Sequence, residues 1–269
     1  MKTRAITGFF FVVVMLAAFF CGAYVFLGFF SLLSLLCLFE FYGLIKTTGI
    51  YPQQLLGLLI GLIICACSAS YWLNASFIGY FSMLIIPLGV AVFFAELYRK
   101  SEKPFHQIAY TFLGLFYTLM PFVFFMALGF FQGNFNFHLP LGFILLLWTN
   151  DTFAYLFGRK FGKTKLFERH SPKKTWEGFI GGIVATALIA FLISRYFQEV
   201  SAIHWIIVAL IISIFGTMSD LVESMLKRSI NVKDSGIILP GHGGLLDRFD
   251  GLLLAAPLVF IYLYLFSNL

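Results

Sequence analysis

Charged residues are scarce in this sequence. Only 11% of the 269 residues are Asp, Glu, Lys or Arg, whereas 61% are hydrophobic and 36 are Phe. A soluble globular chain carries about 25% charged residues. So little polar side chain cannot coat a water-exposed surface around this much apolar area, which excludes a soluble fold. The sequence instead predicts a protein that uses the lipid bilayer as its solvent.

Motifs that mark several other classes of protein are also missing. The sequence has no Walker pattern, no dinucleotide-binding fingerprint and no D-G-x2-A-R motif of the CDP-alcohol phosphotransferases. The few cysteines lie inside apolar stretches, and Cys65 and Cys67 have no nearby His or second Cys pair that could complete a metal site. We therefore expect the cysteines to be buried apolar side chains.

Nine continuous apolar stretches dominate the chain. A membrane-spanning helix needs about 20 mostly apolar residues, and continuous runs favour helices over the alternating strands of a barrel. The stretches cover residues 5–20, 24–45, 55–73, 77–97, 108–131, 139–158, 176–197, 203–225 and 249–266. The sequence predicts an all-α, polytopic membrane bundle, with five helices in residues 1–131 and a catalytic region in residues 132–269. Residues 159–175 and 226–248 are its predicted cytoplasmic loops.

Positive charge alternates between successive connections. Apart from Arg195, every Lys and Arg lies in the N-terminal tail or after the second, fourth, sixth or eighth stretch. Cytoplasmic loops carry the excess of Lys and Arg, so the N-terminus is predicted inside and the C-terminus outside. The net charge of +6 then indicates a basic inner face beside anionic lipid and requires no nucleic-acid partner.

Ionisable residues also enter the apolar stretches, where they usually mark function because burial in lipid is costly. Asp220, Ser224 and Lys227 share one helical face by their spacing, which suits a metal ion and a phosphate. The alternative is an amphipathic helix end with a snorkelling lysine. Asn150 and Asp151 lie inside the sixth stretch, where they either line a site or form a polar contact between helices.

The segment that leads into the ninth stretch mixes acids, bases and glycines. Asp247 and Asp250 offer the hard oxygen ligands that Mg²⁺ prefers. Gly243 and Gly244 let the backbone approach a ligand closely. Basic residues in or near this segment could hold phosphates: Arg228, Lys233, His242 and Arg248. Lys173 and Lys174, in the basic segment after the sixth stretch, could do the same. The alternative for that segment is a basic loop that only obeys the positive-inside rule. Glu40 and Glu96 either line a cavity or are solvated or paired residues at helix ends, and the second interpretation is favoured.

The run from Ser224 to Asp250, S-x-L-K-R-x4-K-D-x-G-x2-L-P-x-H-G-G-x2-D-R-x-D, resembles the signature of the phosphatidate cytidylyltransferase family. The likeness is strong from Trp148 to Asp250 and generic before it. The resemblance implies CTP and phosphatidic acid as substrates, Mg²⁺ with or without a second monovalent or divalent cation, and a homodimer. It also implies Asp220 and Asp247 as metal ligands, with Ser224 and Lys227 beside them, at the cytoplasmic face of the cell (inner) membrane.

Two other functions stay open at this point. A CTP-dependent lipid kinase, of the polyprenol or phytol kinase type, would transfer the γ-phosphoryl group of CTP instead of the CMP unit. A membrane transporter would use the buried charges to line a pathway, although transporter sites typically lie at the bilayer midplane. The gathering of polar residues toward one face favours an enzyme.

Overall fold

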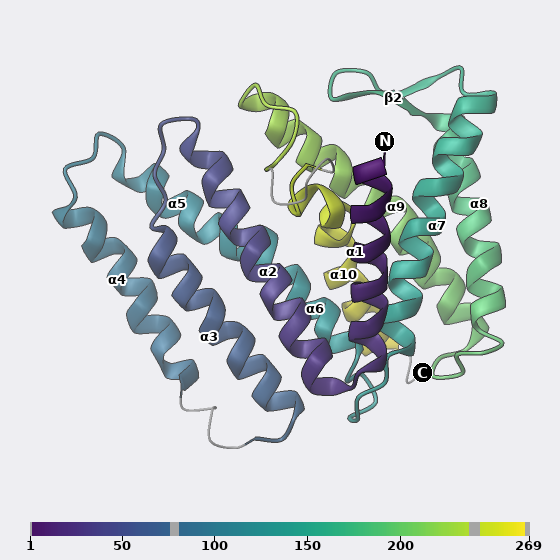
Figure 1. The fold of residues 1–269 in the computed structure, drawn as a ribbon, viewed down its shortest axis with the longest axis horizontal. Coiled ribbons are helices and arrows are strands. Elements are labelled where there is room, and N and C mark those ends of the chain that lie inside the picture. Colours follow the sequence, from purple (N-terminus) through teal and green to yellow (C-terminus); the bar gives the residue numbers. More distant parts are fainter. Residues whose placement is uncertain (1, 76–80, 237–242, 267–269) are drawn as a thin grey trace. The chain divides into compact units, whose positions relative to one another are not determined.

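The described chain is almost wholly helical, with one short β-hairpin (Figure 1). The computed structural model describes residues 2–75, 81–236 and 243–266, with side chains of the first helix described from residue 8. The hairpin pairs β1 (Lys165–Phe167) with β2 (Ser171–Thr175). The helices of this part of the chain are α1 (Lys2–Phe20), α2 (Ala23–Lys46), α3 (Gln54–Trp72), α4 (Ile85–Tyr98), α5 (Pro104–Gly114), the π-helical turn η2 (Leu115–Leu119), α6 (Met120–Leu128), α7 (His138–Phe161), α8 (Trp176–Ile193), α9 (Ala202–Ser229) and α10 (Leu246–Phe266).

Within the described residues, eight helices are long and apolar enough to cross a membrane. The elements α5, η2 and α6 form one of them, Pro104–Leu128, and α4 with its preceding turn forms another, Phe81–Tyr98. The described apolar part of α1, Gly8–Phe20, is shorter. Each of the nine predicted apolar stretches corresponds to a helical segment. The prediction of an all-α, polytopic membrane protein is therefore confirmed.

The surface of these helices is also that of a membrane protein. Large apolar side chains stand exposed along them, such as Leu97 at 73% and Leu188 at 63%. In water, each such side chain would cost free energy in proportion to its exposed apolar area, about 25 cal/mol per Å². Lipid tails contact the same surface without that cost, so the exposed side chains identify the face that lipid covers.

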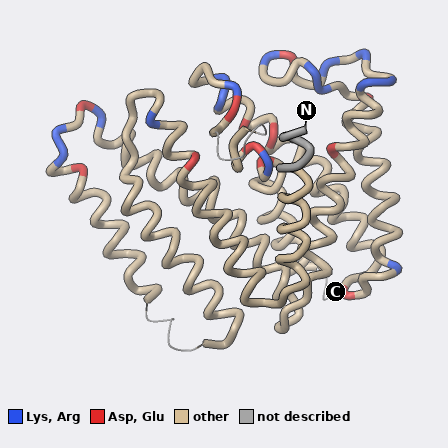
Figure 2. The backbone as a smooth tube through the Cα atoms, in the orientation of Figure 1, with Lys and Arg blue, Asp and Glu red and all other residues tan. Residues whose placement is uncertain are grey.

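The chain divides into two compact units. Unit 1 contains Met1–Met126 and Asp234–Arg248, and unit 2 contains Ala127–Lys233 and Phe249–Leu269. In unit 1, Lys46 ends α2, and charged residues gather where α4 joins α5 (Figure 2). In unit 2, they gather at the hairpin and after α9, whereas Arg195 follows the opposite end of α8. This separation agrees with the alternation along the sequence, and the orientation of the termini stays a prediction.

The core of unit 1 is built around α2. Four buried rings from α1, α2 and α6 pack with centroids 4.8 to 6.5 Å apart: Phe19, Phe26, Phe30 and Phe125. Nearer the end of α2, the Tyr42 hydroxyl donates to the Thr111 carbonyl at 2.7 Å. Gly57 and Gly114 lie against the Tyr42 ring, where a Cβ would clash. Small residues thus let α3 and α5 pack closely on the end of α2 that carries Glu40.

Unit 2 is built from α7, α8 and α9, with α10 packed on α9. Glycines on α8 allow its backbone to approach α7 closely. A Cβ at Gly178 would lie 2.6 Å from the Ala154 carbonyl oxygen, and one at Gly182 would lie 2.8 Å from Asn150 Oδ1. This close packing sets the rotation of α7, so that Asn150 faces the interior of unit 2.

The connection between α7 and α8 differs from the predicted loop over 159–175. Helix α7 continues to Phe161, and the ladder of β1 and β2 then pairs Lys165 with Thr175 and Phe167 with Ser171. The strands are too short to produce a recognisable alternation of apolar and polar residues. Thr175 ends the hairpin and caps α8, because its hydroxyl accepts the Gly178 N–H at 3.2 Å.

Candidate active site

Asp220 lies at the centre of a polar face on α9. Its Oδ1 accepts a hydrogen bond at 3.3 Å from the hydroxyl of Ser224, one turn further along the helix. Its Oδ2 lies 2.5 Å from the Lys174 ammonium, which belongs to β2. The Asp220 side chain is still 35% exposed. It is therefore paired with a cation and also accessible to a ligand.

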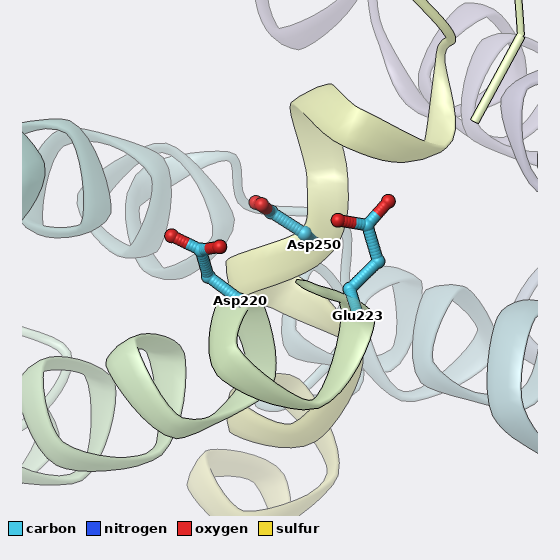
Figure 3. Close-up of side chains that lie close together, drawn as sticks. All are labelled: Asp220, Glu223 and Asp250. Atoms are coloured by element: carbon cyan, nitrogen blue, oxygen red, sulfur yellow. The ribbon is translucent and has the colours of Figure 1, made fainter. Parts of the chain in front are cut away.

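Two further carboxylates approach Asp220, as Figure 3 shows. Glu223 comes from α9 and Asp250 from α10, and one oxygen of each of the three side chains lies within 4.8 Å of the others. Ser219 ties the two helices together, because its hydroxyl donates to the backbone carbonyl of Asp250. Carboxylates this close repel one another unless positive charge lies near them. Their hard oxygens suit a divalent cation such as Mg²⁺.

Glu223 is fully buried, and its carboxylate lies 2.5 Å from the Lys227 ammonium one turn along α9. Lys227 is predicted from the sequence to bind phosphate, and Glu223 has no predicted role. In the structure, Lys227 places its charge on the carboxylate cluster itself. The spacing of Glu223, three residues after Asp220 and four before Lys227, is the signal that could have identified it.

A cavity of about 300 Å³ lies beside Asp220 in unit 2. Its lining brings Asp220 together with four other predicted site residues, Asn150, Asp151, Lys173 and Lys174. These residues come from α7, β2 and α9, so segments far apart in the sequence meet here. Ligand pockets occupy about 300 to 1,000 Å³, and this cavity lies at the lower end of that range.

Asn150 and Thr217 line this cavity and connect α7 to α9. Asn150 is 1% exposed, and its amide donates to the Thr217 hydroxyl at 3.3 Å. The backbone carbonyl of Thr217 also lies 3.5 Å from the Lys174 ammonium. Both interpretations of Asn150 therefore apply: it makes a polar contact between helices, and it lines the cavity. Thr217 had no predicted role, since a threonine in an apolar stretch carries no signal of its own.

Residues 234–248 of the predicted signature belong to unit 1. Asp247 Oδ2 accepts the backbone N–H groups of Ser235 and Gly244, each at 2.9 Å. Gly243 has φ of 82°, and a Cβ there would lie 2.9 Å from the same oxygen, so only glycine fits. Asp247 therefore organises its own segment, and its assignment as a metal ligand stays a prediction. His242 lies outside the described residues.

The other predicted phosphate-binding residues are exposed. Lys173 lies in β2, Arg248 in the first turn of α10, and Lys233 after α9. The Arg228 guanidinium donates to the Val232 carbonyl at 3.3 Å, close to the end of α9. Exposed cations such as these can meet a soluble anion.

Unit 2 thus combines a cluster of hard oxygen ligands, a paired lysine and a cavity of ligand size. Residues 2–266 match the sequence profile of the cytidylyltransferase family. The chain belongs to this family. In unit 2, the carboxylate cluster could bind a cation, and the adjacent lysines could bind phosphate.

Several relatives resemble this cytidylyltransferase over nearly their whole length. The chain is 36% identical to the phosphatidate cytidylyltransferases of Staphylococcus haemolyticus (strain JCSC1435) and Staphylococcus aureus (strain COL), over 271 and 267 residues. Each alignment covers 98% of this chain and 99% of the relative. The similarity therefore extends through the N-terminal helices, where the sequence resemblance alone was only generic.

Proposed function

We propose that this member of the cytidylyltransferase family joins CTP to phosphatidic acid and forms CDP-diacylglycerol and pyrophosphate. The observation that carries the proposal lies in unit 2, where a cluster of three carboxylates and Lys174 adjoin a cavity of about 300 Å³. The names of the relatives, which align over 98% of the chain, support the choice of a phosphatidate substrate.

The barrier to this reaction arises largely from bringing two anions together. Lys174 and Lys173 line the same cavity and would offset the negative charge of a bound triphosphate. Lys227, Arg228, Lys233 and Arg248 are further cations that could hold phosphate oxygens. Fixed charges aimed at transferring phosphoryl groups supply much of the rate enhancement in such reactions, because they need no reorganisation during the step.

The carboxylate cluster fits a divalent cation. Asp220, Glu223 and Asp250 present hard oxygen ligands within 4.8 Å of one another, which is the donor set that Mg²⁺ prefers. A bound Mg²⁺ would neutralise phosphate charge and orient the reacting groups. Asp247 is the further ligand implied by the family resemblance, which also leaves room for a second monovalent or divalent cation.

In the proposed step, an oxygen of the lipid phosphate forms a bond to the α-phosphorus of CTP. The bond from that phosphorus to the α,β-bridging oxygen breaks, and pyrophosphate leaves with the electron pair. A phosphate monoester has a second pKa of about 6, so the attacking oxygen is already ionised at neutral pH. The chain therefore does not need a general base, and positioning and charge neutralisation are its main tasks.

The proposal includes the setting of the reaction. We place the protein in the cell (inner) membrane with its catalytic end facing the cytoplasm, where CTP is dissolved. The positive-inside rule supports this orientation. Most of the proposed chemistry belongs to residues 132–269, as the sequence division predicts. The homodimer rests on the family resemblance.

Product identity tests the proposal directly. The purified protein in detergent is given phosphatidic acid, Mg²⁺ and CTP labelled at either the α or the γ phosphate. We expect the α label in a lipid with the mass of CDP-diacylglycerol and the γ label in pyrophosphate. Recovery of the γ label in lipid would identify a CTP-dependent lipid kinase instead. Folded protein that labels no lipid would overturn the proposal and favour a transporter.

A further inference from the structure

Glu40 is a buried carboxylate in α2, distant in sequence from every predicted site residue. It is 5% exposed, and its Oε2 accepts the backbone N–H of Leu246 at 2.8 Å. Leu246 is the first residue of α10. Of the two predicted states of Glu40, solvated or paired, the structure shows the paired one: its carboxylate meets the N-terminus of another helix within unit 1.

The segment before α10 packs directly on the Glu40 carboxylate. A Cβ at Gly236 would lie 2.5 Å from Glu40 Oε1, and one at Gly244 would lie 2.8 Å from Oε2. Both glycines are needed because the backbone itself contacts the carboxylate. Ser235 is also buried in this packing, since its hydroxyl would clash with a Cβ at Gly244.

Asp247 also binds the backbone of this segment. Its Oδ2 accepts the N–H groups of Ser235 and Gly244, while Glu40 accepts the N–H of Leu246. Two carboxylates therefore fix one short stretch of backbone, and the second of them is a predicted site residue. The first turn of α10 carries Asp247 and Arg248, and Asp250 follows on the same helix.

The Leu246 N–H offsets part of the cost of burying the Glu40 carboxylate. A buried carboxylate is costly unless hydrogen bonds and positive potential compensate for lost hydration. The free N–H groups and the macrodipole at a helix N-terminus supply both. Loss of Glu40 would leave the Leu246 N–H buried without an acceptor and would loosen the start of α10.

We propose that Glu40 is a positioning residue, whose carboxylate sets the orientation of Asp247 and Arg248 by capping α10. This inference rests on the proposed function, since it assigns Glu40 to the cytidylyltransferase reaction. Glu40 acts through the segment and does not touch substrate. It also gives the N-terminal helices a part in the chemistry, because α2 supplies the group that holds the signature segment.

Unit 1 offers a matched control in Glu96. This carboxylate of α4 is 2% exposed and is held by the Gln53 amide and, at 3.3 Å, by Arg99. It is as deeply buried as Glu40, but none of these partners belongs to the signature segment. A general loss of stability should affect Glu40 and Glu96 variants alike, whereas loss of positioning should affect only Glu40 variants.

The first measurement compares Glu40→Ala, Glu40→Gln and Glu96→Ala in the CTP-dependent lipid assay. Misplacement by about 1 Å costs about 100-fold in rate, so we expect Glu40→Ala to lower kcat by about that factor with a small change in the KM for CTP. Glu40→Gln keeps an acceptor oxygen of the same reach and should recover most of this loss. Glu96→Ala should keep near-normal kcat in its folded fraction.

The second measurement needs no catalysis. Hydrogen–deuterium exchange without substrate should be faster in peptides covering residues 243–250 in Glu40→Ala, and unchanged there in Glu96→Ala. Unchanged exchange, or equal kcat losses in the two alanine variants, would overturn the positioning role. If the wild-type protein formed no CDP-diacylglycerol while exchange still changed, only the proposed function would fail. If Glu40→Ala does not fold, Glu40→Leu, which fills the space but offers no acceptor, is judged by both measurements instead, with slower turnover and faster exchange than Glu96→Leu as the expected result.

Discussion

The carboxylates of the two units have different surroundings. In unit 1, Glu40 and Asp247 accept backbone N–H groups at 2.8 and 2.9 Å, so peptide dipoles stabilise their charges. In unit 2, the carboxylates of Asp220, Glu223 and Asp250 lie within 4.8 Å of one another and face lysines. Carboxylates held by the backbone shape a segment, whereas carboxylates gathered together attract a mobile cation. The unit 1 pair thus has the character of a scaffold and the unit 2 cluster that of a binding site.

This contrast predicts that removing charge has a larger effect in unit 2. Asp220→Asn keeps the size of the side chain and removes one negative charge from the cluster. Loss of a single electrostatic group in an active site costs about 100- to 1,000-fold, and we expect the upper end for kcat here. Turnover of phosphatidic acid at several Mg²⁺ concentrations measures the effect.

Glu168→Gln is a suitable control for Asp220→Asn. Glu168 is exposed in the turn of the hairpin, so its variant removes the same charge from unit 2 outside the cluster. It should retain near-normal turnover. Similar activity in both variants would contradict a metal site at Asp220.

Asp247→Asn tests whether a carboxylate of unit 1 also binds a metal ion. An asparagine side-chain oxygen can still accept the N–H groups of Ser235 and Gly244, so the segment should keep its conformation. If Asp247 is also a metal ligand, as the family resemblance implies, kcat should fall about 100-fold despite intact structure. Near-normal turnover would leave Asp247 with the scaffold role alone. Unchanged exchange protection of residues 243–250 would establish that the segment is intact in the variant.

Lys174→Ala tests the cationic side of the unit 2 site. Hydrogen bonds to charged groups contribute about 1.5 to 3 kcal/mol, which corresponds to about 10- to 100-fold in kcat/KM for CTP. Lys165→Ala removes the same charge from β1, at a position that does not line the cavity. Equal losses in the two variants would indicate that only the overall charge of the hairpin matters.

Hydropathy and charge alternation predicted the helices, because a membrane span is a local property of about 20 consecutive residues. They did not predict the hairpin, whose strands of 3 and 5 residues are too short to show a period. Candidate site residues could be grouped from the sequence where they are adjacent or share one helical face, as with Asp220 and Ser224, which are hydrogen-bonded in the structure. Glu40 and Thr217 were missed because their roles depend on which helices pack together, and a single sequence does not report that packing.

The smallest predicted effect concerns packing. Gly178→Ala would place a Cβ 2.6 Å from the Ala154 carbonyl oxygen, so α8 must move away from α7. Overpacking of this kind costs about 1 to 3 kcal/mol, and we expect a matching decrease in the apparent Tm measured in detergent. In unit 1, a Cβ at Gly28 would meet nothing within 4 Å. Gly28→Ala should therefore leave Tm unchanged or raise it slightly, since alanine favours helix.

The position of Gly178 links this packing to the site. It follows the capping residue Thr175 by one helical turn, and Lys174 immediately precedes that cap. A shift of α8 should therefore reach Lys174 and lower kcat/KM for CTP by a few-fold in Gly178→Ala. Gly28→Ala should leave kcat/KM unchanged. A normal kcat/KM in a clearly destabilised Gly178→Ala would separate the α7–α8 packing from the placement of Lys174, and the hairpin alone would then hold that lysine beside Asp220.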